Sequence, residues 1–429
     1  MSARGRLIDV APLRTGRAFR RLWLGSLLAA LGGQMSMVAL LQQVWDLTGS
    51  AALMGTLGLA HAVPMVVLGL YGGALADSYD RRRVVLATTG GASVVAVALA
   101  LQAAARVEAL AVVLALVAVQ AGCGALGAPA RRALIARLLP GDQVAAGVAV
   151  THVGFQVAML VGPALGGVLV AVGGTASCFA GQAVLLVVAW GTTRGLPAVP
   201  ARGDGGGVQD RVPRQRAAVR RGLAYVVRSP ALRGAVLTDV LATVLVMPVS
   251  LFPVVVDARF GGDPAVTGLL LSAVGAGGIL GGLASGVASR AEHPGRVMVV
   301  AATTWCAGVA AFGASPWLLP ALAALAVAGA ADTLAVIARG VVTQLAATDG
   351  YRGRVSSVEH VVGVAGPDLG NARGGVVSGL TSPEVALVSG GLVGAAGVLA
   401  VAATHPALRA FSRASPAVPH APRRRPARR

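Results

Sequence analysis

Long apolar stretches separated by short polar turns recur along almost the whole chain. Each is about 20 residues or longer, the length an α-helix needs to cross the hydrocarbon core of a bilayer. We therefore predict an all-α integral membrane fold with twelve transmembrane helices, which places both chain ends on one side. The predicted spans are 22–45, 51–76, 84–105, 109–130, 144–172, 174–193, 234–256, 266–289, 297–315, 317–338, 355–380 and 385–404.

The basic residues predict which side of the membrane carries the chain ends. With these spans, 33 of the 36 basic residues fall before the first span, in every second loop, or after the last span. Cytoplasmic loops of membrane proteins are enriched in arginine and lysine. We predict a multi-pass protein of the bacterial plasma membrane with both termini in the cytoplasm.

The composition agrees with a membrane protein. Hydrophobic residues make up 55% of the chain, charged residues 12%, and the mean hydropathy is +0.75, values that a soluble protein of this length could hardly bury. The net charge of +19 could suggest nucleic acid as a partner, but it is spread over alternate loops and not gathered in one patch. We expect no nucleic acid, and expect the basic tail to lie against anionic membrane lipid.

Several kinds of chemistry are not expected. Every basic residue is arginine, so the lysine of a P-loop ATPase or of a Schiff base is missing. Cys123, Cys178 and Cys306 lie inside predicted helices and lack the spacing of metal ligands. We predict a monomer that is not an enzyme, with no cofactor and no metal, in which any energy-requiring process would use an ion gradient or a separate motor subunit.

An internal repeat indicates two halves. Gly162-Pro163-Ala-Leu-Gly166 is repeated as Gly366-Pro367-Asp-Leu-Gly370, and a polar stretch rich in proline and arginine lies between the two copies. The predicted division is a six-helix bundle at 1–193, a cytoplasmic linker at 194–228, a second six-helix bundle at 229–405 and a basic cytoplasmic tail at 406–429. A short amphipathic helix is expected around 215–228.

The turn between the second and third spans carries a recognisable motif. Its residues are Gly73, Asp77, Asp80, Arg81, Arg82 and Arg83. The turn resembles the signature loop of the major facilitator superfamily, a family of transporters that pack two six-helix halves around a central cavity. The resemblance implies that Asp77 pairs with a neighbouring helix end and with the arginines, and that these contacts hold the cytoplasmic side closed. An ordinary positive-inside turn would explain the arginines alone.

The fifth span carries a second motif. Its residues are Gly154, Gly162, Pro163, Gly166 and Gly167. They resemble the exporter signature of the superfamily, in which glycine and proline bend the helix and allow it to pack tightly against the other half. Generic packing of small residues remains the alternative. With Gly127 to Pro140, which is similar to the connection between the fourth and fifth helices of the siderophore and drug efflux branch, it favours export.

Charged residues inside the spans are the candidates for proton coupling. Charge within a membrane is costly, so such residues commonly serve function. The candidates are Asp332, Asp239, Asp368 and Arg373. Asp239 and Asp332 are expected near one another, where burial and mutual repulsion would favour protonation of one carboxylate. Carboxylates bonded to loop groups, or a structural ion pair involving Arg373, remain alternatives, and Glu359 is expected to join the loop arginines Arg352 and Arg354.

The first half offers uncharged polar residues for a substrate cavity. They are Gln34, Gln42, Gln120, His152 and Gln156. Amides among apolar neighbours suit a large ligand of mixed polarity. His61 and His152 are interpreted as helix-packing residues, with a proton relay as the alternative.

Together these features predict a secondary active exporter of small molecules. A proton-coupled exporter of a siderophore or a similar amphipathic molecule, working by alternating access, is the first hypothesis. A broad multidrug efflux pump is the alternative, and a membrane sensor or scaffold without transport is a third.

Overall fold

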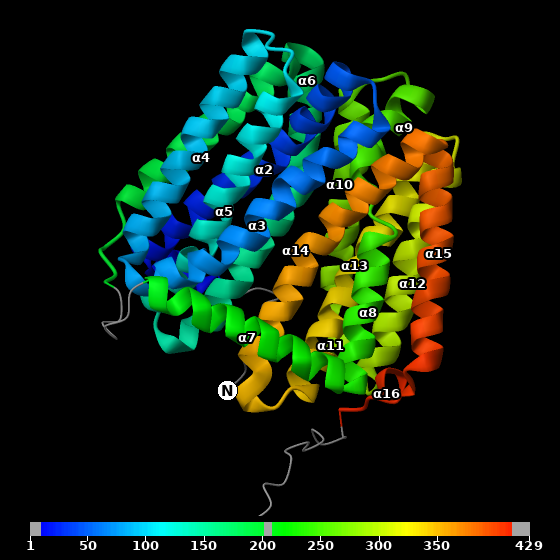
Figure 1. Ribbon diagram of the computed structural model, residues 1–429. Coiled ribbons are helices and arrows are strands. Elements are labelled where there is room, and N and C mark those ends of the chain that lie inside the picture. The colour runs from blue at the N-terminus through cyan, green and yellow to red at the C-terminus, as the bar shows by residue number, and fades with distance from the viewer. Residues whose placement is uncertain (1–9, 201–207, 414–429) are drawn as a thin grey trace, which may run out of the picture.

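The computed structural model describes residues 10–200 and 208–413. Helices account for most of these residues, and the described ranges contain no strand (Figure 1). The first part comprises α1 (Ala11–Thr15), α2 (Arg17–Thr48), α3 (Ala51–Ser78), α4 (Arg81–Ala104), α5 (Leu110–Leu138), η1 (Gly141–Gln143) and α6 (Val144–Arg194). The rest comprises α7 (Val208–Arg228), α8 (Pro230–Val244), η2 (Val249–Leu251), α9 (Phe252–Arg259), α10 (Pro264–Leu283), α11 (Ser285–Arg290), α12 (Pro294–Ala314), α13 (Leu318–Ala346), α14 (Asp349–Leu380), α15 (Pro383–Thr404) and α16 (Pro406–Arg409).

The predicted all-α membrane fold is confirmed. Within the described residues, ten segments are long and apolar enough to cross a bilayer. One of them holds α6, which continues through a kink at Gly174 (φ 72°, ψ 177°) and so makes two crossings; a positive φ is readily adopted by glycine. One further crossing, the eleventh in chain order, is α14. It is absent from those ten segments and contains Glu359, Asp368 and Arg373.

The helices form two groups. In the first, α2 and α4 pack on α6, and α3 and α4 pack on α5; in the second, α12 packs on α13 and α15, and α10 packs on α13. The groups meet along two seams, where α3 lies beside α14 and α6 lies beside α10 (Figure 1). We call the face that carries α7 and α16 the linker face, and the opposite face the far face.

Glycines draw the halves together near the far face. A Cβ at Gly55 would lie 2.8 Å from the Cα of Ala372, and one at Gly167 would lie 2.8 Å from the carbonyl oxygen of Pro264. Only a residue without a side chain allows backbones to approach this closely. Nearer the linker face, Gly69 of α3 has no atom within 4 Å of such a position. The α3–α14 seam is therefore tight at the far face and looser toward the linker face.

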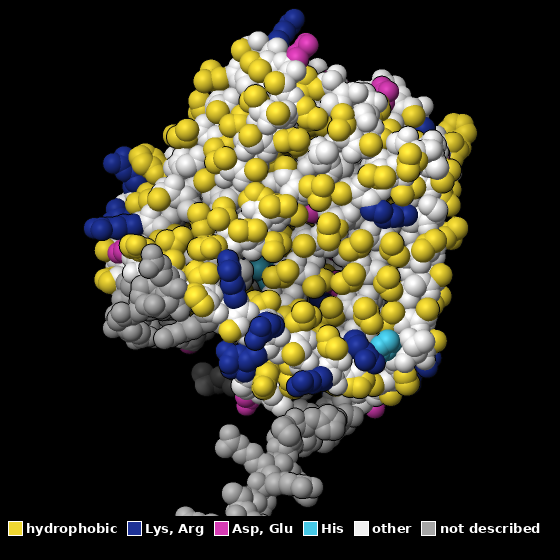
Figure 2. All heavy atoms as spheres, viewed as in Figure 1, with side chains coloured by type: hydrophobic (Ala, Val, Ile, Leu, Met, Phe, Trp, Pro, Cys, Tyr) yellow, Lys and Arg dark blue, Asp and Glu magenta, His cyan; other side chains and the backbone are white. Residues whose placement is uncertain are grey.

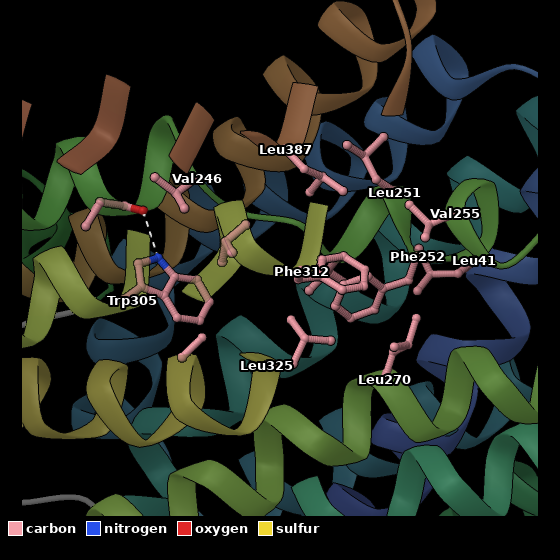
Figure 3. Close-up of a cluster of buried hydrophobic side chains, with 14 of the residues drawn as sticks. Leu41, Val246, Leu251, Phe252, Val255, Leu270, Trp305, Phe312, Leu325 and Leu387 are labelled. Carbon is pink, nitrogen blue, oxygen red and sulfur yellow. Dashed lines mark hydrogen bonds between the residues drawn. The ribbon is translucent and has the colours of Figure 1, made fainter. Parts of the chain in front are cut away.

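The seventh crossing is broken. One continuous span at 234–256 was predicted, but α8 ends at Val244 and the helix resumes at η2 and α9. Pro248 and Pro253 lack the amide hydrogen that a continuous helix needs. The break is buried: Phe252 packs edge-on against Phe312 with ring centroids 5.4 Å apart, and Trp305 donates a hydrogen bond to the Ala242 carbonyl, 3.1 Å away (Figure 3).

The linker helix α7 crosses the linker face. It touches both α3 and α14, and it passes beneath both halves in Figure 1. A helix was expected only around 215–228, and the observed helix begins earlier, at Val208. Hydrophobic side chains cover the middle of the molecule, while arginine side chains gather on and around α7 (Figure 2). This distribution is the one that a membrane-embedded body with a basic face requires.

Candidate functional site

A central cavity lies between the two halves. Its volume is about 650 Å³, within the range of ordinary ligand sites. Apolar side chains supply much of the wall, and the polar residues are Gln34, Ser36, Gln120, Ser250 and Asn371, together with His61 and Asp368. The structure thus brings Gln34 and Gln120, two of the predicted cavity residues, into one wall. The arrangement suits a large ligand with a few hydrogen-bonding groups.

An ionisable pair bridges the halves inside this cavity. His61 Nδ1 of α3 lies 2.8 Å from Asp368 Oδ2 of α14. Gly58, one turn before His61, makes the contact possible, because a Cβ there would lie 2.5 Å from the Asp368 carbonyl oxygen. Among the residues that line the cavity, these are the only two with ionisable side chains. A proton gained or lost here would change the bond that joins the two halves.

Arg373 does not pair with Asp368. Its guanidinium donates to the carbonyl oxygen of Leu245, just past the end of α8. Asn371 forms hydrogen bonds with η2 in the same interrupted crossing. Its Oδ1 accepts from the Ser250 amide at 3.0 Å, and its carbonyl accepts from the Ser250 hydroxyl at 2.9 Å. The ends of a broken helix leave backbone groups without partners inside the segment. α14 supplies those partners, so the contact made by Arg373 is structural.

A second charged cluster lies in the second half, near the linker face. Arg339 of α13 forms ion pairs with Asp239 of α8 and, at 3.9 Å, with Glu359 of α14. Glu359 also accepts a hydrogen bond from the Thr343 hydroxyl. Asp332, two turns before Arg339, lies close enough to interact electrostatically with both Asp239 and Arg339. The structure thus brings Asp239 and Asp332 together, as the sequence suggested, but around an arginine.

The expected place of Glu359 was wrong. It was assigned to a loop cluster with Arg352 and Arg354, but Arg352 pairs with Asp349, 2.8 Å away, and the Arg354 guanidinium lies over the Tyr351 ring. The reason is that α13 extends to Ala346, well beyond the predicted boundary at 338, so that Arg339 and Thr343 stand on the helix that faces Glu359.

Three other predicted cavity residues lie elsewhere. Gln42 is buried and donates to the Asp46 carboxylate at 2.8 Å, one turn along α2. His152 is exposed and lines neither the central cavity nor the cavities of about 330 Å³ and 440 Å³ on its linker side. Gln156 Nε2 lies beside Gly278 of α10, at the seam between the halves. The sequence could place these residues on a helix but not on the face that meets the cavity.

The glycines of the fifth crossing divide between two partners. Gly167 and Pro163 face α10 of the other half, where Gly268 approaches the Pro163 carbonyl. Gly154, Gly162 and Gly166 instead face α2 of the same half, and a Cβ at Gly166 would lie 2.5 Å from the Met35 carbonyl oxygen. Consecutive residues on a helix point about 100° apart, so one glycine run serves two contacts.

The signature turn contacts the end of α6 and the linker. Arg82 donates to the Arg194 carbonyl at 2.6 Å, and Arg81 donates to the Pro200 carbonyl at 3.1 Å. Asp80 caps α4 by accepting from the Arg83 amide at 3.1 Å. Asp77 is exposed near the end of α3, and Gly73 faces Gln215 of α7. Arg81 and Arg82 thus bind backbone carbonyls, which the end of a helix leaves unsatisfied.

Comparison with known proteins identifies the family. Residues 8–423 match the family described as transmembrane secretion effector, a branch of the major facilitator superfamily. The chain belongs to this family. It is 26% identical to the enterobactin exporter EntS of Citrobacter koseri, covering 92% of this chain and 93% of the relative, and 24% identical to EntS of Shigella boydii, covering 91% and 92%.

Solved structures agree on the fold. The nucleoside transporter NupG matches with a TM-score of 0.66 at 15% identity, covering 92% of this chain and all of NupG. A bacterial homologue of the lysosomal transporter Spinster, in an inward-facing and unoccupied conformation, matches with a TM-score of 0.65 at 17% identity, covering 93% and 97%. This chain is thus a multi-pass membrane transporter of the major facilitator superfamily.

Two residues of the site were missed from sequence. Arg339 follows the predicted span 317–338 and was counted with the loop arginines, and the similarity of its Val-Ile-Ala-Arg run to Leu-Ile-Ala-Arg137 in the first half indicated only the internal repeat. His61 had no local signal for its partner, which is 307 residues away. For this member of the superfamily, the charges in the spans have specific partners that only the packed helices reveal.

Proposed function

We propose that this transporter is a proton-coupled exporter of a siderophore or a similar amphipathic small molecule, working by alternating access in a bacterial plasma membrane. The linker face is its cytoplasmic face and both termini lie there. The observation that carries the proposal is a cavity between the halves that contains one ionisable pair, His61 and Asp368, contributed by both halves.

The shape of the seams supports alternating access. Glycine contacts close the far face, and further cavities of about 330 Å³ and 440 Å³ lie toward the linker face. A solute from the cytoplasm would therefore meet an accessible cavity, while the far face is sealed. Release requires the opposite arrangement, in which the seams at α3–α14 and α6–α10 part.

Proton coupling requires an acid whose bonds differ between the two arrangements. Asp368 meets this condition, because its partner is on the other half. Asp332 and Asp239 are the remaining candidates, and Arg373 is set aside because it bonds to the break after α8. One proton moving through about 150 mV supplies roughly 3.5 kcal/mol, which sustains an outward gradient of roughly 300-fold.

The test is transport in proteoliposomes with an imposed pH gradient. We expect gradient-driven movement of enterobactin, and we expect Asp368→Asn, Asp332→Asn or Asp239→Asn to retain exchange but lose the response to the gradient. Asp142→Asn, an exposed acid in η1, is the control. Full gradient-driven transport by all three variants would overturn proton coupling through these residues.

The substrate class is tested in the same vesicles. Transport of rhodamine 6G but not enterobactin would support the multidrug alternative. Movement of neither compound nor of other amphipathic solutes, by protein shown to be folded, would support a sensor or scaffold instead.

A further inference from the structure

Two neighbouring arginines of α5 line the cavities on the linker side of the central cavity. Arg131 and Arg132 both contribute to the 440 Å³ cavity between α2, α5 and α6. Arg132 also lines the 330 Å³ cavity between α3, α7 and α14. The larger of these two shares Ala30, Gly124 and Phe155 with the wall of the central cavity. The two arginines therefore line neighbouring cavities that share walls with the central cavity.

Neither guanidinium has a carboxylate partner in residues 10–200 and 208–413. Arg131 is half-buried and donates one hydrogen bond, to the Thr89 hydroxyl at 3.2 Å. Besides the two arginines, the linings of these cavities contain the imidazole of His360 with hydroxyl, amide, indole and apolar groups, and no Asp or Glu. Two positive charges thus face these cavities without a counter-charge in their walls.

The charge of Arg131 is costly unless a ligand or another group compensates it, because this half-buried guanidinium loses hydration that its hydroxyl partner does not replace. Arg132 is exposed, so its guanidinium is accessible to a solute in the same cavities. Its planar fork of N–H donors matches carboxylate, sulfate, phosphate and phenolate oxygens. Trp23 and Phe155 line the same cavity and offer apolar surface beside the charge. The wall therefore fits a molecule with an anionic group attached to an apolar body.

A positive-inside role alone does not explain both arginines. Arg137, on the same helix, is exposed and lines none of the three cavities. A residue that only sets the topology needs no contact with a cavity. In the second half the nearest charged cluster contains three carboxylates, Asp239, Asp332 and Glu359, and one arginine. This cluster is net negative and the arginine pair on α5 is positive, which would direct an anion toward α5.

We infer that Arg131 and Arg132 bind the anionic group of the transported molecule, so that the substrate class is an anionic amphipathic solute. The inference rests on the proposed transport function. It adds a specific site on the first half, near the linker face, where a solute is held before it reaches His61 and Asp368.

The experiment measures equilibrium binding by the full-length protein in nanodiscs of neutral phosphatidylcholine. The probes are pyrene-1-sulfonate and its uncharged counterpart 1-pyrenemethanol, detected by energy transfer from tryptophan. We expect Arg131→Gln and Arg132→Gln to weaken sulfonate binding roughly tenfold or more, as loss of a charge-assisted bond implies, and to leave binding of the alcohol unchanged. Arg137→Gln is the matched control and should bind both probes like the original protein.

Two further variants keep the result interpretable. If Arg131→Gln does not fold, Arg131→Lys keeps the charge without the fork and should weaken the sulfonate more than the alcohol. Equal weakening of both probes, or unchanged sulfonate binding in the Arg131→Gln/Arg132→Gln double variant, would overturn the proposed site.

Competition experiments distinguish a free solute from a lipid headgroup as the source of the anionic group. Glycerol phosphate should displace the sulfonate, as a free solute would. Displacement by phosphatidylglycerol in the nanodisc without displacement by glycerol phosphate would mean that the site takes a lipid headgroup, and would overturn the substrate assignment. Because binding is measured without transport, a protein that discriminates the probes but moves neither in vesicles would contradict the transport proposal and leave the anion site intact.

Discussion

At the residue scale, the charges buried in this protein are organised by a few partners. Arg339 is only 13% exposed and contacts Asp239 and Glu359, whose side chains are 14% and 17% exposed. A pair that has lost most of its hydration depends on both members, because removal of one leaves an uncompensated charge. The exposed pair Asp349 and Arg352, in contrast, remains hydrated.

If Asp239 serves as the structural partner of Arg339 and not as the coupling acid, Asp239→Asn should destabilise the protein by about 3 to 5 kcal/mol, since it leaves Arg339 without its closest partner. Arg339→Gln in the same chain should recover a large part of the loss. Thermal unfolding in detergent measures both. Asp349→Asn is the control and should cost less than about 1 kcal/mol. An Asp239→Asn variant as stable as the original would show that Arg339 does not depend on this carboxylate.

His61 and Asp368 share one bond, which gives a second residue-scale prediction. His61→Asn and Asp368→Asn should each abolish the response of transport to a pH gradient, and the double variant should be no worse than either one, because all three lack the same interaction. Proteoliposome flux under an imposed gradient measures this. Additive losses would mean that the two residues act separately.

At the element scale, glycine positions decide which helices can touch. Gly167 allows α6 to approach α10, whereas Gly282 of α10 has open space around it. The same reasoning separates two glycines at the contacts of α7, Gly73 of α3 and Gly222 of α7 itself. A Cβ at Gly73 would meet the movable amide of Gln215, whereas one at Gly222 would meet the backbone of Arg354, which cannot move aside as easily.

Gly167→Leu should push α6 away from α10, cost about 1 to 3 kcal/mol through overpacking, and reduce efflux. Gly282→Leu should change neither stability nor efflux, because nothing lies in its way. Thermal unfolding and vesicle flux are the measurements. Normal efflux by Gly167→Leu would remove the argument that this seam requires a glycine.

The signature turn gives a further prediction at this scale. If Asp77 helps to close the linker face, Asp77→Asn should favour the arrangement open toward α7 and depress efflux without lowering expression. Labelling of a cysteine introduced at Ser357, which lines the linker-side cavity, by a membrane-impermeant thiol reagent should then become faster. Unchanged labelling and wild-type efflux would end the latch hypothesis.

At the scale of the whole molecule, the far face is closed by contacts between the halves. Ala52 of α3 and Gly379 of α14 lie together there, and a Cβ at Gly379 would be 3.1 Å from the Cβ of Ala52. Disulfides span Cβ atoms about 3.8 Å apart, so a small adjustment would permit a bridge. A transporter that alternates must open this seam.

Cysteines at Ala52 and Gly379 should therefore form a disulfide on mild oxidation and stop efflux, and reduction should restore it. Each single variant is the control and, with Cys123 replaced by alanine because it is only partly buried, should be insensitive to the oxidant, since Cys178 and Cys306 are buried. Electrophoretic mobility and vesicle flux report the bridge and its effect. Full efflux by the cross-linked protein would contradict alternating access through this seam.

Local properties of the sequence determined much of the architecture. Hydropathy over windows of about 20 residues predicted the crossings, because each helix satisfies its own backbone within the membrane. The repeated Gly-Pro run indicated two halves. The helix break after Val244 was signalled by Pro248 and Pro253 but was read as one span, because the stretch remains apolar throughout.

The partners of the charged residues were decided only by the tertiary structure. The sequence marked Asp239, Asp332 and Asp368 as unusual because charge is rare in a membrane, but it could not show that Arg339 joins the first two or that His61 meets the third. Those contacts depend on how each helix is rotated and how closely glycines let neighbours approach. Rotation and approach are set by packing between distant segments, which local hydropathy and spacing do not contain.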